Sequence, residues 1–169
     1  ASAVFLGSTV TEFVSDVSRQ RQETDKKLAD LQIFLEGFDA ARFGAGFKGK
    51  LDSALANIDA IKGKREAIDR LRISGNEAIN YFENTIASSL DVVADISTLS
   101  SNTEITIMTA AYVNFLLAKE RVGRERALMS NTFAMDRFEP GMFNKFTSFV
   151  TEQNAYMSVF LSFASSEQR

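Results

Sequence analysis

At 169 residues the chain is long enough for one domain with a hydrophobic core and too short to suggest two. It contains neither Cys nor His, which excludes disulfide scaffolds, structural zinc sites, thiol nucleophiles and imidazole bases. Its net charge of −3 arises from interspersed charges of both signs, so we expect no nucleic-acid partner. We also expect no cofactor, no metal and no enzymatic activity.

Helical segments are predicted wherever apolar residues recur at steps of three or four. The first covers about 10–38 and ends in a glycine-containing loop at 43–47. The second covers about 48–73 and the third about 77–99. Between them, the sequence at 74–76 (SGN) predicts either a sharp turn or a kink, because Gly and Asn tolerate left-handed backbone.

Two further helices complete the predicted fold. Residues 101–104 (SNTE) offer N-capping side chains to a fourth helix that reaches about 138, and Pro140 separates it from a fifth. No segment alternates with period two, so a sheet is not expected. Long amphipathic helices with short connections predict an all-α fold, namely an antiparallel helical bundle of the four-helix type, in a single domain spanning 1–169.

The fourth helix is predicted to turn an aromatic and aliphatic face towards the core. Lys119 and Arg126 fall on this same face when each residue is placed at 100° per step. By the same placement, the more polar side carries Arg121, Arg124 and Glu125. The apolar members of the predicted inward face are Ile105, Met108, Tyr112, Phe115, Leu116, Val122, Met129 and Phe133.

Other polar side chains also interrupt apolar faces. Arg21 and Thr24 do so in the first helix, Arg65 in the second and Gln153 in the fifth. A buried guanidinium costs several kcal/mol unless a negative group pairs with it. One hypothesis is an internal partner, because Asp25 lies one helical turn after Arg21. The bundle would then be a structural or protein-binding one without a small-molecule ligand.

The competing hypothesis is a bound inorganic anion. A guanidinium presents planar, forked donors that match the edge of an oxyanion with two hydrogen bonds. Arg21 and Arg126 would supply these forks, and Thr24 and Gln153 would add neutral donors. Lys119 and Arg65 are weaker candidates, because long cationic side chains at a face edge or a helix end often reach solvent.

Three stretches resemble the nitrate- and nitrite-sensing (NIT) domain family. They are residues 3–8 (AVFLGS), 19–25 (RQRQETD) and, more closely, 119–127 (KERVGRERA) with the downstream Phe133-Ala134 pair. Members of that family are all-helical and occur in bacterial chemoreceptors, sensor kinases and a transcription antiterminator. The resemblance implies nitrate or nitrite binding through arginines of the first and fourth helices, which match Arg21 and Arg126.

The same resemblance carries expectations about context. It implies a sensory module that signals by a helix displacement of about 1–2 Å, most simply read out in a homodimer. We expect a periplasmic domain of an inner-membrane receptor. Its transmembrane segments would lie outside this chain, because no run of about 18 apolar residues is present and the chain opens without an initiator Met.

Overall fold

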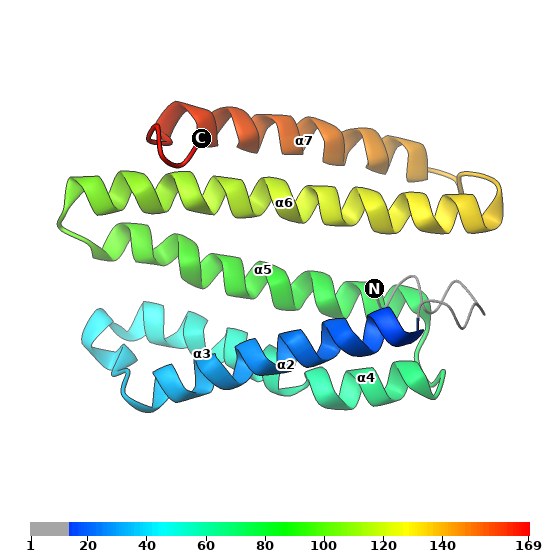
Figure 1. The fold of residues 1–169 in the computed structure, drawn as a ribbon, viewed down its shortest axis with the longest axis horizontal. Coiled ribbons are helices and arrows are strands. Elements are labelled where there is room, and N and C mark those ends of the chain that lie inside the picture. The colour runs from blue at the N-terminus through cyan, green and yellow to red at the C-terminus, as the bar shows by residue number, and fades with distance from the viewer. Residues whose placement is uncertain (1–13) are drawn as a thin grey trace. The chain divides into compact units, whose positions relative to one another are not determined.

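The computed structural model describes residues 14–169, and every regular element in that range is helical, as Figure 1 shows. The predicted all-α helical bundle is therefore confirmed. The predicted start of the first helix at 10, and the sequence before it, lie outside the described residues. Among the described helices, none combines the length and the apolar character needed to cross a bilayer. The chain divides into two compact units, 1–85 and 86–169, which we describe in turn.

The first unit consists of helices joined by short connections. The loop predicted at 43–47 is shorter than expected, because a 3-10 turn leads through Gly44, at φ 94°, directly into the next helix. Stacked and edge-on rings of Phe34, Phe38, Phe43 and Phe47 pack around this corner. The elements are α2 (Val14–Glu36), η2 (Ala40–Phe43), α3 (Ala45–Asp59), α4 (Ile61–Asp69) and the first part of α5 (Gly75–Leu99).

The second predicted helix, 48–73, is in fact two helices. It breaks at Ala60, which keeps helical backbone angles (φ −74°, ψ −10°), and no Gly or Pro marks the position. Near the end of α3, the carbonyl of Asn57 accepts a hydrogen bond from the Tyr81 hydroxyl. The end of α3 is thus joined to a residue distant in sequence. The predicted inward residues Ile61 and Ile68 are buried.

The second and third predicted helices are joined by a true turn and not by a kink, but the turn lies at 70–74, slightly before the predicted 74–76. Leu71 adopts a left-handed conformation (φ 52°), and α5 begins at Gly75. Ser74 and Glu77 cap the new helix reciprocally: the Ser74 amide donates to the Glu77 carboxylate at 2.8 Å, and the Glu77 amide donates to the Ser74 hydroxyl at 3.2 Å. The second and third predicted helices are therefore separate.

The second unit is dominated by a long helical hairpin. Asn102 caps its first helix as predicted, since its side chain accepts hydrogen bonds from the amides of Glu104 and Ile105. Asp136, in a left-handed conformation, ends that helix, and Pro140 lies in the connection to the next. Figure 1 shows the two helices packed side by side along their length. They are α6 (Thr103–Met135) and α7 (Met142–Phe163).

The face that α6 buries is not the predicted one. Ala111, Ala118 and Thr132 are buried, and with Glu125 they form a row at seven-residue spacing. Such a row of small side chains lets a neighbouring helix approach closely. Phe160 of α7 and Ala164, directly after that helix, complete this core with Ala111.

The predicted inward face of α6 is largely exposed. Arg121, Arg124 and Glu125, which were predicted on the polar side, are instead half-buried. The prediction was wrong because aromatic size dominated the sequence pattern, whereas the packing uses the small residues. The exposed members of the predicted face are Ile105, Met108, Tyr112, Phe115, Val122 and Phe133.

Candidate functional site

Two arginines of the first unit lie between α2 and α4, each paired with an aspartate of the opposite helix. Arg21 donates from Nη1 and Nη2 to the two oxygens of Asp69, at 2.7 and 2.8 Å. Arg65 donates from Nη1 to Asp25 at 2.5 Å. Both guanidinium side chains are mostly buried, with 22% and 14% of their surface exposed. We call these four residues the Arg-Asp quartet.

The spacing of the quartet explains why it forms. Each helix carries an Arg followed four residues later by an Asp, which places the two side chains one turn apart on one face. Because α2 and α4 run antiparallel, the Arg of one helix meets the Asp of the other. The predicted pair within α2, Arg21 with Asp25, is therefore wrong: Arg21 turns to Asp69, and Asp25 accepts from Arg65.

Hydrogen bonding within the quartet shifts two pKa values. The bonds from Arg21 lower the pKa of Asp69 below its ordinary value, against the opposing effect of burial, and Arg65 adds a smaller electrostatic contribution. The same bonds raise the pKa of Arg21. Because the folded pKa of Asp69 is lowered, its contribution to stability is present above the ordinary Asp pKa. That contribution is lost as the pH falls through the lowered value.

The remaining candidate of α2 is already engaged. Thr24 is half-buried, and its hydroxyl donates to the Gln20 carbonyl at 2.8 Å, within the same helix. To donate to a ligand it would have to release this bond, although its oxygen can still accept. Unlike the Thr24 hydroxyl, the Nε atom of Arg21 donates to no partner among the described residues, although it is buried.

The candidates of the second unit do not form a buried cluster. Arg126 and Lys119 are exposed on the apolar face of α6, and neither makes an ion pair or a hydrogen bond with another residue of 14–169. Gln153 is half-buried on α7. The expectation that Arg126 is buried is thus wrong, for the same reason that the face was misassigned. The site residues consequently fall into two groups, Arg21, Thr24 and Arg65 in one unit and the others in the second.

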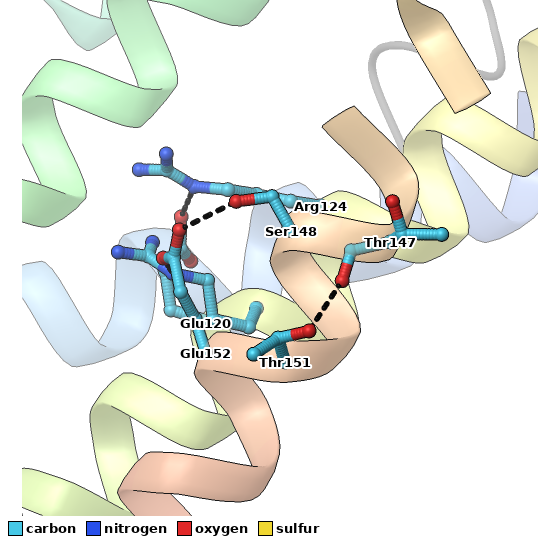
Figure 2. Close-up of polar contacts among 7 residues, drawn as sticks. Glu120, Arg124, Thr147, Ser148, Thr151 and Glu152 are labelled. Carbon is cyan, nitrogen blue, oxygen red and sulfur yellow. Dashed lines mark hydrogen bonds and ion pairs between the residues drawn. The ribbon is translucent and has the colours of Figure 1, made fainter. Parts of the chain in front are cut away.

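A polar network that the sequence analysis missed joins α6 to α7. Arg121 pairs with Glu152 of α7 and lies over the Tyr156 ring. Figure 2 shows the adjoining contacts: Arg124 donates to Glu120 at 2.9 Å, and the Ser148 hydroxyl donates to Glu152 at 3.1 Å. Arg121 joins α6 to α7 through Glu152 and the Tyr156 ring, whereas the Arg124 and Ser148 bonds each lie within one helix and orient the carboxylates of Glu120 and Glu152.

Glu125 is the unsatisfied member of this region. Its Oε1 atom is buried without a hydrogen-bond partner in 14–169, on the row of small residues that α6 buries. An unsatisfied buried polar atom costs about 1–3 kcal/mol.

We therefore expect Glu125→Met, which keeps the volume and removes the oxygen, to raise the unfolding free energy by about 1 kcal/mol in a urea titration. Glu23→Met, at an exposed position of α2, should change it by less than about 0.5 kcal/mol. A loss of stability in Glu125→Met would contradict the assignment of Glu125 as unsatisfied.

The described part of the chain is an all-α helical bundle in which two arginines of the first unit are paired with aspartates. Comparison with family models places it further: the NIT model, described as nitrate and nitrite sensing, matches residues 1–169. The chain therefore belongs to the NIT family, which is sensory and not enzymatic. Neither the curated proteins nor the solved structures that were compared contain a match.

Proposed function

We propose that this chain is the ligand-binding domain of a bacterial chemoreceptor or related signal transducer, and that nitrate or nitrite bridges Arg21 and Arg126. The observation that carries the proposal is the match of the nitrate- and nitrite-sensing family to the whole chain. The two arginines fall in the two stretches that resemble that family most, 19–25 and 119–127.

The chemistry of the side chains supports an oxyanion. Arg21 presents a partly buried guanidinium, where low water content strengthens a charge-assisted hydrogen bond. Arg126 is exposed and has no ion-pair partner within 14–169, so its fork is available. Thr24 and Gln153 would add neutral donors. Lys119 and Arg65 remain weaker candidates, Arg65 because Asp25 already pairs with it.

Signalling would follow from a difference in affinity between two helix arrangements. A ligand shifts an equilibrium only by as much as it prefers one state. An anion that neutralises two arginines from different helices favours the arrangement in which they approach each other, and a helix shift of about 1–2 Å is a common response. We propose that residues 1–169 act as one domain, that two copies pair, and that the domain is periplasmic in an inner-membrane receptor.

A second candidate function also has an observation in its favour. Arg21 and Arg65 each have a carboxylate partner in the first unit, so both charges are already compensated. A structural or protein-binding bundle would need nothing more. In that case no anion would stabilise the protein selectively. Arg21→Ala would then act only by removing a pair whose aspartate is 44% exposed, which costs about 1 kcal/mol or less.

The deciding experiment is a thermal-unfolding series with nitrate, nitrite, chloride and sulfate at constant ionic strength. An anion present at about 100 times its dissociation constant adds roughly 2.7 kcal/mol, which raises the midpoint of a chain of this size by several degrees. We expect this rise with nitrate or nitrite and not with chloride or sulfate. Arg21→Ala and Arg126→Ala should each abolish it.

Arg19→Ala is the matched control. Arg19 lies two residues before Arg21 on α2, and its side chain is 71% exposed and pairs with Asp16. We expect this variant to keep the full anion response. If no anion acts selectively on the unsubstituted chain, the sensor proposal is wrong and the structural bundle takes its place. A response that survives Arg126→Ala would remove Arg126 from the site.

A further inference from the structure

In the Arg-Asp quartet, Asp69 occupies the donors of Arg21 that an oxyanion would need. Asp69 accepts from both terminal nitrogens of Arg21, with one carboxylate oxygen on each. A planar oxyanion binds a guanidinium through the same two-oxygen geometry. Asp69 is thus a carboxylate in the place where the proposed function puts an anion.

The pairing also leaves the guanidinium incompletely satisfied. The Nε atom of Arg21 is buried and has no partner in 14–169, although its two terminal nitrogens are both engaged. Buried polar atoms in folded proteins are nearly always hydrogen-bonded, so an exception of this kind requires an explanation. A guanidinium with a spare buried donor has more hydrogen-bonding capacity than Asp69 uses.

The partners of the two arginines differ from the arginines in exposure. The Asp69 and Asp25 side chains are 44% and 58% exposed, against 22% and 14% for the guanidinium side chains that they meet. Asp69 is also the last residue of α4, next to the turn at Leu71. It can therefore turn into solvent at little cost, while Arg21 stays between the helices. This asymmetry makes the carboxylate the replaceable member of the pair.

We propose that Asp69 is an internal competitor of the anion. Asp69 holds the guanidinium of Arg21 until the anion displaces it, and in this way Asp69 sets the affinity of the protein for the anion. The proposal rests on the proposed function and deepens it. When Asp69 leaves, one of the two ion pairs that join α2 and α4 in the described residues is lost, and Arg65 with Asp25 remains. Anion binding is in this way coupled to a loosening of α4 from α2.

The test measures the nitrate concentration at half-saturation, from the thermal midpoint of the whole chain titrated with sodium nitrate against sodium chloride at constant ionic strength. Asp69→Asn removes the charge but keeps the shape, and Asp69→Ala removes the hydrogen-bonding group as well. We expect both variants to bind nitrate about tenfold more tightly than the unsubstituted chain, because the competing state of Arg21 is removed.

Glu66→Gln is the matched control, since Glu66 lies exposed on the same helix and outside the quartet. It removes the same charge and should change the nitrate concentration at half-saturation by less than about twofold. If Glu66→Gln tightens binding as much as Asp69→Asn does, the effect is one of net charge, and the competitor role is wrong.

The outcomes separate this inference from the proposed function. If the unsubstituted chain responds to nitrate but neither Asp69 variant binds more tightly, the sensor proposal stands and the competitor is refuted. If a variant responds to nitrate and the unsubstituted chain does not, both proposals fail, because Asp69 then prevents binding in the natural sequence instead of setting its affinity. If none of the proteins responds to nitrate, both proposals fail together.

Discussion

Replacement of Phe160 by Ala is expected to lower the unfolding free energy by about 3–5 kcal/mol. The ring is 8% exposed and packs against Ala111, Ala164 and Met157 in the core of the α6–α7 hairpin. It also lies 5.3 Å from the Phe115 ring, centroid to centroid. Because Ala111 and Ala164 are too small to fill the space, the cavity would remain. Thermal unfolding should show a midpoint lower by roughly 10 °C.

Phe163→Ala tests whether burial causes this loss. Phe163 is the last residue of the same helix and is 49% exposed. Its truncation removes an equal number of atoms, but about half of the surface of Phe163 stays in water in the folded chain. We expect a loss of less than about 1 kcal/mol. Equal losses at the two positions would mean that the α6–α7 core does not carry the stability of the second unit.

The existence and ends of most helices followed from local chemistry in the sequence. The side chain of Asn102 accepts from two amides at the start of α6, and Ser74 with Glu77 does the equivalent for α5. Such signals act within three residues and are readable directly. The break at Ala60 is different, because the Tyr81 hydroxyl that bonds the Asn57 carbonyl comes from a later helix. No pattern within the 48–73 segment indicates it.

The orientation of α6 shows how a strong pattern can mislead. Hydrophobic periodicity favoured its aromatic face, yet the described structure buries the row that includes Ala111, Ala118 and Thr132. A search for small residues at seven-residue spacing would have found this row. It would also have placed Arg121 and Arg124 beside α7, where they meet Glu152 and the Phe149 ring.

For the Arg-Asp quartet, the sequence predicted the two arginines but not their partners. Arg21 and Arg65 interrupt apolar faces in the sequence and were therefore predicted to need a negative partner, and both have one. It chose the wrong carboxylate, because the partner lies on another helix and only the antiparallel register of α2 and α4 brings it there. The available signal was the repeated Arg-x-x-x-Asp spacing, at Arg21 and again at Arg65.

Ile68→Ala is the second substitution with a large expected effect. Ile68 has no exposed surface and precedes Asp69 at the end of α4, so it anchors the helix that carries half of the quartet. We expect the unfolding free energy in a urea titration to fall by about 2–5 kcal/mol, because the truncated side chain leaves a cavity that neither water nor a neighbouring side chain fills. Ile33→Ala, on α2 and 68% exposed, should cost less than about 1 kcal/mol. A small effect at Ile68 would contradict its complete burial.

Combining the two large substitutions tests the proposal that residues 1–169 are one domain. Ile68 lies in the first compact unit and Phe160 in the second. If the chain unfolds as one cooperative domain, each substitution lowers the midpoint of the same single transition, and their losses add within about 0.5 kcal/mol. If the units unfold independently, each substitution shifts only one of two transitions. That second result would contradict the single-domain proposal.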